Sequence, residues 1–454
     1  MKFSTATLIA VLSSILSVEA SCSYDGGNYY CSETTKVVYK GIGFSGSYQD
    51  VTNMDESSGS CTQQSYSFSG NLSPLDEELS VHFRGPLKLL QFGVYYPSGS
   101  NSKAKREVED CNTQHIHHKH KRATEVVQVT QTVLVDGNGN TVTSQTTETA
   151  TVDDNAQQQQ DTSSSSSSSA AAAGTTSITN LAGQGKAYRS ISTSSAPTTT
   201  SSDSSSSETA SADGAWERDT YYTPGNADNC VFLNYYGGSG SGVWSSKFGN
   251  SLSYANSDNS GGSSSAVALE EVTIGSNTEF VVMSGQECSG NSCGYYRDGT
   301  VAYHGFNGSE KIFIFEFEMP SDGSSGFNAD MPAVWLLNAK IPRTLQYGDS
   351  SCSCWKTGCG ELDLFEILSS GSDKLISHLH DGQGASSNTN NGGGGSQDYF
   401  ARPTSGSLKA AVIFTSNEIH IVQVDDSTDF GSSLDEDTVN SWLQQSGSAA
   451  TIGY

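Results

Sequence analysis

The chain has 454 residues, and its 49 acidic side chains outnumber its 23 basic ones, giving a formal net charge of −26 at pH 7. So acidic a chain excludes a nucleic-acid partner, because phosphate backbones are bound through lysine and arginine. No Gly-x-Gly-x-x-Gly follows a predicted strand and no phosphate-binding loop occurs, so we expect no cofactor.

The N-terminal residues predict a secretory signal peptide over residues 1–20. Lys2 supplies the basic start, an apolar run covers residues 6–16, and Ala20 ends a small-residue cleavage site. The apolar run is too short to span a membrane. The C-terminal residues lack the hydrophobic tail of a GPI signal. We therefore expect a secreted protein, soluble or held in a wall by other means, with no membrane partner.

Residues 21–102 form a small unit rich in Cys and Gly, with strands predicted over residues 37–39, 66–68, 79–83 and 87–96. A unit of this size is marginal by itself. It is either a wall-binding module with tyrosines as sugar platforms or a supplier of strands to a downstream sandwich. The apolar run over residues 87–96 is typical of a buried core strand and favours the second alternative. N-glycosylation sequons begin at Asn71 and Asn307.

The ten cysteines of an exported chain predict disulfides rather than a metal site. The numbers before and after the central low-complexity segment are both even, which favours pairing within each half. The three cysteines just before residue 361 are expected to staple a loop. The two sets are Cys22, Cys31, Cys61 and Cys111, and Cys230, Cys288, Cys293, Cys352, Cys354 and Cys359.

Residues 103–122 carry two basic clusters, which end at Arg106 and Arg122 and predict processing by a late-secretory protease. Cleavage after Arg122 alone is the simpler hypothesis, because cutting at both sites would release Cys111. The histidines between the clusters fit a copper or zinc site less well than a soluble cleavage segment. Residues 123–214 are dominated by Ser, Thr, Gln and Ala, which predicts a disordered, O-glycosylated linker.

Residues 215–454 suffice for one β-sandwich domain. One helix is predicted over residues 434–445 with Ser433 as its cap. Gly, Ser and Asn clusters separate short apolar or alternating runs, as in sandwiches. The predicted strands span residues 230–233, 266–269, 279–283, 311–318, 361–368, 375–380, 408–414 and 419–424.

Three acids, Glu361, Asp363 and Glu366, lie among the apolar residues of one predicted strand. Buried strands rarely carry carboxylates, because an unpartnered buried ion is costly. Alternation puts Glu366 on the opposite face from the other two, and one extra residue near Leu364 or Phe365 would bring it back. The alternative is an edge strand with its acids in water.

With that bulge, the three acids would lie side by side in an open groove. Outer carboxyl groups roughly 5–5.5 Å apart suit a retaining glycosidase, one as nucleophile and the other as acid/base. The middle carboxyl group would hold a proton or hydrogen bond between them and separate their pKa values.

The motif Glu-x-Asp-x-x-Glu resembles the active-site signature of the laminarinase-like branch of glycoside hydrolase family 16. Residues 315–320 resemble a strand of that family that ends in a Met-Pro turn. Residues 332–338 are similar to its Pro-Ala-x-Trp-Leu-Leu stretch, and residues 378–380 stand where the family has a strand histidine. The resemblance implies Glu361 as nucleophile, Asp363 as assistant and Glu366 as general acid/base.

Most of the chain apart from the linker also resembles a fungal cell-wall family of circularly permuted 1,3-β-glucanases. The features that match are the two-part layout, the Cys- and Gly-rich N-terminal segment, and residues 303–307 and 352–355. This resemblance implies an all-β fold, a β-sandwich of the concanavalin-like jelly-roll type that is circularly permuted.

 The resemblance also implies that the substrate and partner of this chain is cell-wall β-glucan.

Trp335, Trp355 and His380 are the candidate substrate-binding residues. The two tryptophans, with Tyr295 or Tyr296, could stack on glucose rings, and core packing is the alternative for each. His380 could hydrogen-bond Glu366 or be a structural histidine.

The predicted function is a monomeric retaining endo-1,3-β-glucanase that acts in wall remodelling. A glucan transglycosylase of the same fold and a non-catalytic glucan-binding wall glycoprotein are the alternatives. The presence of all three acids argues against the last, because a binder needs none of them. A Cys-rich insertion before Glu361 departs from the family 16 pattern and leaves the linkage specificity open.

Overall fold

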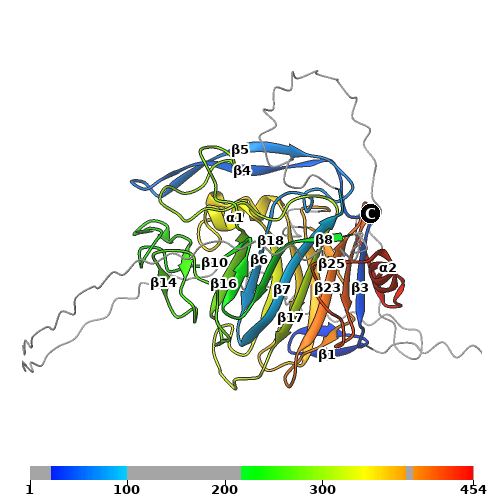
Figure 1. Ribbon diagram of the computed structural model, residues 1–454. Helices are drawn as coiled ribbons and strands as arrows, with labels where there is room; N and C mark the ends of the chain where they lie inside the picture. Colours follow the sequence, from blue (N-terminus) through cyan, green and yellow to red (C-terminus); the bar gives the residue numbers. More distant parts are fainter. Residues whose placement is uncertain (1–21, 100–215, 385–391, 453–454) are drawn as a thin grey trace, which may run out of the picture. The chain divides into compact units, whose positions relative to one another are not determined.

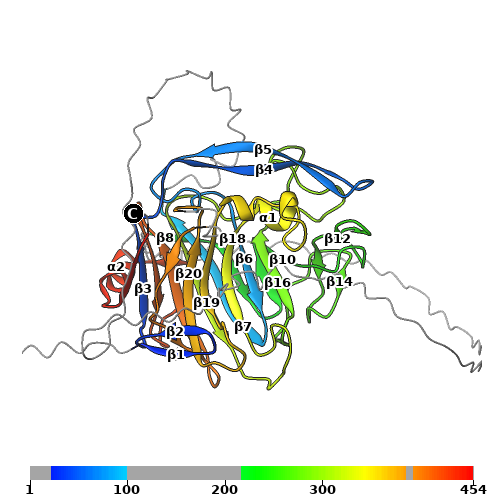
Figure 2. The same ribbon diagram turned by 180° about the vertical axis from the view of Figure 1, so that it is seen from behind.

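The computed structural model describes residues 22–99, 216–384 and 392–452. Two sheets of ten strands each form a sandwich, and nearly all of their strand pairs are antiparallel (Figures 1 and 2). This is the all-β sandwich that the strand pattern predicted.

The first sheet has the order β14 (Gly262–Ser263), β13 (Ser253–Ala255), β10 (Cys230–Asn234), β16 (Glu279–Ser284), β6 (Leu79–Arg84), β18 (Ala333–Asn338), β19 (Glu361–Glu366), β20 (Lys374–His380) and β21 (Gly394–Gly395), and β22 (Phe400–Ala401) also pairs with β20. The second sheet has the order β25 (Ser433–Leu434), β8 (Trp216–Thr223), β7 (Leu87–Pro97), β17 (Lys311–Glu318), β23 (Leu408–Phe414), β24 (Glu418–Gln423), β3 (Lys36–Lys40) and β26 (Ser448–Thr451), with β15 (Thr273–Ile274) on β7 and β9 (Asn226–Asp228) on β8.

Three hairpins and four short helical segments complete the described secondary structure. The hairpins are β1 (Ser23–Asp25) with β2 (Asn28–Tyr30), β4 (Gly46–Asp55) with β5 (Ser60–Phe68), and β11 (Trp244–Ser245) with β12 (Gly249–Asn250). The helical segments are α1 (Lys340–Arg343), η1 (Ser350–Cys352), η2 (Trp355–Thr357) and α2 (Glu436–Gln444).

The main core lies between the two sheets and is rich in aromatic rings. Phe83 of the first sheet stacks on Phe280 at 4.7 Å between ring centroids, and Phe315 of the second sheet lies 6.2 Å from Phe83. All three are buried. Burial of such large apolar side chains is the main favourable term for the sandwich.

The N-terminal segment supplies strands to both sheets. β6 lies between β16 and β18, β7 lies between β8 and β17, and β3 lies between β24 and β26. Of the two alternatives for residues 21–102, this pairing corresponds to the supply of strands to the sandwich. The segment joins the sandwich because β7 is a central strand whose apolar side chains are buried on both of its faces.

The prediction that the disulfides pair within each half is wrong for one bond. Cys61 of β5 is bonded to Cys352 of η1, 291 residues away. The β4–β5 hairpin contacts η1 because its flanking strands belong to the sandwich. The other three bonds join Cys22 to Cys31, Cys288 to Cys293, and Cys354 to Cys359. Within the described ranges Cys230 is bonded to no cysteine, and Cys111 lies outside them.

Two local predictions also need correction. Residues 266–269 form no strand, and the carbonyl of Leu269 accepts hydrogen bonds from Tyr222 and Gly225 instead. The C-terminal helix begins at Glu436, and Asp435 rather than Ser433 is its cap, because Ser433 pairs with β8. The α1 segment was not predicted.

Several predictions lie outside the described residues: the signal peptide over residues 1–20, the processing sites at Arg106 and Arg122, and the linker over residues 123–214. Of the described helical segments, none combines the length and apolar character needed to cross a membrane. Asn71 is exposed and Asn307 is partly exposed.

Candidate active site

A β-bulge in β19 brings the three acids to one face of the first sheet. Across β18, Trp335 is paired with Asp363 but Val334 is paired with Phe365, so β19 has one extra residue there. The same irregularity occurs against β20, between Asp363 and Glu366. The predicted bulge is confirmed, at the predicted position.

The two faces of β19 have different neighbours. Leu362, Leu364 and Phe365 belong to the main core between the sheets. The acids lie opposite Leu337, Trp335 and Ala333 of β18, which form a separate apolar cluster with residues of the hairpin and loops. Glu361, Asp363 and Glu366 therefore lie on the outer face of the first sheet, the sheet whose strands β18, β19 and β20 are labelled in Figure 2.

The site is more enclosed than the expected open groove. Glu361 is 2 % exposed and Asp363 is 6 % exposed, whereas the side chain of Glu366 is 15 % exposed. The loop between β18 and β19 is closed by the Cys354–Cys359 disulfide and carries Trp355. The Trp355 indole N–H donates a hydrogen bond to Glu361 Oε2, so this loop shields one end of the acidic row.

Burial and mutual repulsion set the charge state of the outer acids. Burial raises the pKa of Glu361, Asp363 raises it further, and His380 and the Trp355 hydrogen bond partly offset these effects. Burial and Asp363 likewise raise the pKa of Glu366, with Arg84 opposing them. Both outer acids therefore favour the neutral form more than a solvent-exposed glutamate does.

Arg84 is a site residue that the sequence pattern did not single out. Its guanidinium lies 3.2 Å from Glu366 Oε1, and its Nε donates to the Met331 carbonyl at 2.8 Å. Arg84 is 1 % exposed and lies on β6, across Ala333 from Glu366. The available signal was alternation, since Ser80, His82 and Arg84 put polar groups on one face of an otherwise apolar strand.

The predicted substrate-binding residues have different surroundings. Trp335 is fully buried beside Asp363 and stacks on His82 at 5.0 Å between ring centroids. Trp355 is only partly buried. His380 Nε2 lies 3.5 Å from Asp363 Oδ2, so this histidine faces the middle acid, whereas the sequence suggested a bond to Glu366.

Tyr295 supports the hairpin. Its hydroxyl accepts a hydrogen bond from the Met54 backbone N–H at 2.8 Å. The Cys61–Cys352 bond and the contact of Gln63 Nε2 with the Ser353 carbonyl at 3.1 Å also join the hairpin to the loop before β19. The N-terminal half thus buttresses the loop that carries Trp355.

A β-sandwich with a row of carboxyl groups on one strand is typical of carbohydrate-active proteins of the glycosidase class. Comparison with known families identifies a cell-wall protein family. Residues 214–442 match the family model described as "Cell wall protein YJL171C/Tos1, C-terminal", and residues 35–97 match its N-terminal counterpart. The chain belongs to this cell-wall protein family.

Curated relatives span the whole chain. A Candida albicans protein named "Probable circularly permuted 1,3-beta-glucanase TOS1" is 72% identical, with 100% of both chains covered. A Saccharomyces cerevisiae protein of the same name is 55% identical, with 99% of both chains covered. An Arthroderma benhamiae protein named "Probable circularly permuted 1,3-beta-glucanase" is 35% identical over 92% of this chain and 90% of its own. No solved structure matches the chain.

Proposed function

We propose that the protein is a retaining, endo-acting glycoside hydrolase that cleaves β-1,3-glucan and remodels the cell wall. The observation that supports this most is the bulge in β19, which aligns Glu361, Asp363 and Glu366 on one face. The names of the relatives support the substrate class. The wall is the proposed location, after secretion, and the proposed form is a monomer.

In the proposed mechanism, Glu366 protonates the oxygen of the leaving sugar while Glu361 attacks the anomeric carbon. Water then attacks the glycosyl-enzyme, and Glu366 takes the proton of that water. Glu366 must therefore be protonated in the first half and charged in the second. Burial favours the neutral form of Glu366, and Arg84 favours the charged form. These opposing effects suit a group that needs both states.

Asp363 and the groups around it would control the proton of Glu361. Glu361 must be charged to attack, and the Trp355 indole and His380 both favour the charged form. Asp363 lies between the outer acids along the strand, with His380 at 3.5 Å. We assign Asp363 the role of holding a proton or hydrogen bond between its neighbours. Trp355 and His380 would contact the sugar, and the buried Trp335 would pack beside Asp363.

The decisive experiment incubates the purified protein with laminarin, mixed-linkage glucan and a labelled glucan acceptor, beside the Glu361→Gln and Glu366→Gln variants. Wild-type protein should shorten β-1,3 chains, and Glu361→Gln should be roughly 10³-fold slower or inactive. Glucan binding by all three proteins with no product from any would overturn the proposal and favour a non-catalytic wall glycoprotein.

Azide distinguishes the roles of the two outer acids. With an activated glycoside, azide should rescue a Glu361→Gly variant as the α-azide and a Glu366→Ala variant as the β-azide, because only the second retains its nucleophile. The opposite stereochemistry would reverse the assignment.

Transfer to a sugar acceptor is the second candidate reaction. The observation that favours it is the burial of Glu361 beneath Trp355, because an enclosed site limits the access of water to the glycosyl-enzyme. Labelled products longer than the acceptor would identify a transglycosylase, whereas labelled acceptor that stays unchanged beside shortened glucan would identify a hydrolase.

A further inference from the structure

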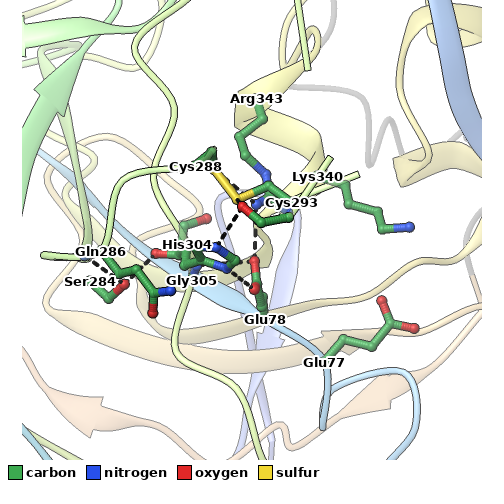
Figure 3. Close-up of polar contacts among 12 residues, drawn as sticks. Glu77, Glu78, Ser284, Gln286, Cys288, Cys293, His304, Gly305, Lys340 and Arg343 are labelled. Carbon is green, nitrogen blue, oxygen red and sulfur yellow. Dashed lines mark hydrogen bonds and ion pairs between the residues drawn. A yellow bond between two sulfur atoms is a disulfide. The ribbon is translucent and has the colours of Figure 1, made fainter. Parts of the chain in front are cut away.

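A serine, a histidine and a glutamate that are joined by hydrogen bonds lie apart from the acidic strand. Ser292 Oγ is 3.1 Å from His304 Nε2, and His304 Nδ1 is 2.5 Å from Glu78 Oε1. Figure 3 shows His304 and Glu78 beside the disulfide of Cys288 and Cys293. A hydroxyl, an imidazole and a carboxylate in this order have the geometry of a nucleophile, its base and the group that orients the base.

Glu78 is held so that one oxygen is free for His304. Its other oxygen, Oε2, accepts from Arg343 Nη1 at 2.9 Å and from the Gly305 backbone N–H at 3.2 Å. Burial raises the pKa of Glu78, but the hydrogen bond with His304 and the charge of Arg343 outweigh it, and the pKa is lowered. A charged Glu78 accepts a hydrogen bond from Nδ1–H of His304, and this tautomer directs the Nε2 lone pair at Ser292.

Ser292 lies on a tight loop that is closed by the Cys288–Cys293 disulfide. Within this loop the Ser289 backbone N–H donates to Ser292 Oγ at 2.9 Å, so the hydroxyl can accept from Ser289 and donate to His304. Ser292 is exposed, whereas His304 is 8 % exposed. No atom lies within 4 Å of the position that a Cβ would take at Gly290 or Gly294, so the surface beside the hydroxyl is open.

Metal binding does not explain this cluster. The sulfur atoms of Cys288 and Cys293 lie within 4.8 Å of a nitrogen of His304, but they are bonded to each other. Both nitrogens of His304 already have partners in Ser292 and Glu78. Beside the cluster, the Nε–H of the buried Arg343 is a hydrogen-bond donor that has no partner among the described residues.

We infer that Ser292, His304 and Glu78 form a second nucleophilic site, which hydrolyses carboxylic esters. His304 Nε2 takes the hydroxyl proton as Ser292 Oγ bonds to the acyl carbon. The ester C–O bond breaks, and the alcohol leaves with the proton from His304. Water then attacks the acyl-serine and gives its proton to His304, and the carboxylic acid leaves as Ser292 recovers a proton. The balance is ester and water to alcohol and acid.

The full chain is tested with a fluorophosphonate probe and with p-nitrophenyl acetate. We expect the probe to label the peptide that contains Ser292, as read by mass spectrometry, and the ester to be hydrolysed with a burst. Ser292→Ala should lose the label, and His304→Gln should lower acylation about 10²–10⁴-fold. The matched control is Asn291→Ala, which shortens an exposed side chain in the same loop and should keep labelling within about twofold of wild type.

The labelling of wild-type protein keeps the test decisive even if a variant fails to fold. No label on folded wild-type protein, label on another residue, or a Ser292→Ala variant that is labelled as fast as wild type would each overturn the inference. Glucan cleavage by the phosphonylated protein should be unchanged, which would show that the ester site acts independently of the acidic strand.

Discussion

Replacing Arg84 with methionine tests how the N-terminal half sets the pKa of Glu366, the proposed acid/base. The guanidinium lies 3.2 Å from Glu366, and the two side chains are 2 % and 15 % exposed. At an effective dielectric constant of about 20, unit charges at this distance attract by about 5 kcal/mol, a ceiling of nearly four pKa units. Because water and neighbouring groups relax around the lost charge, we expect the pKa of Glu366 to rise by about 1–3 units.

The assay is the pH dependence of kcat/KM on laminarin for wild type, Arg84→Met and Arg84→Lys. Loss of the positive charge disfavours the carboxylate form of Glu366, so the limb that reports its deprotonation should move to higher pH in Arg84→Met. Arg84→Lys keeps a charge, so its limb should stay closer to wild type. Circular dichroism and thermal unfolding check that each variant is folded. A folded Arg84→Met protein with the wild-type profile would refute the reasoning.

Three further predictions concern stability, hydrogen bonding and covalent linkage. Folding raises the pKa of Glu361 above its ordinary value of 4.5, so the stability that its carboxyl group contributes below pH 4.5 is lost as pH rises through the folded pKa. Glu361→Gln should therefore raise the free energy of unfolding, and with it Tm, at pH 7–8 but not at pH 4. The expected gain in free energy is about 1.4 kcal/mol for each pKa unit between the folded and unfolded states, and equal effects at both pH values would contradict this. Trp355→Phe removes the indole donor to Glu361. A hydrogen bond to a charged group contributes about 1.5–3 kcal/mol, so kcat should fall about 10- to 150-fold. An unchanged kcat would show that this hydrogen bond does not contribute to catalysis. If the chain is cut after Arg122, the Cys61–Cys352 bond should hold the two pieces together. Denaturing gel electrophoresis should then separate them only after reduction, and separation without reductant would count against this bond.

Local patterns were enough to predict the strand of the acids. The apolar residues around Glu361, Asp363 and Glu366 indicated a buried strand, and the mismatch in alternation required one extra residue. Both inferences use only the two-residue period of a strand. The bulge between Asp363 and Glu366 follows the same logic, since it keeps Leu364 and Phe365 in the core while the acids share the other face.

The partners of these acids were decided by tertiary structure. Arg84 meets Glu366 across 282 residues of sequence, and Cys61 meets Cys352 across 291. Both contacts exist because β6 and the β4–β5 hairpin are built into or against the first sheet. Strand order in a sheet depends on which apolar faces pack together over the whole chain, and a strand's own residues record its period but not its neighbours.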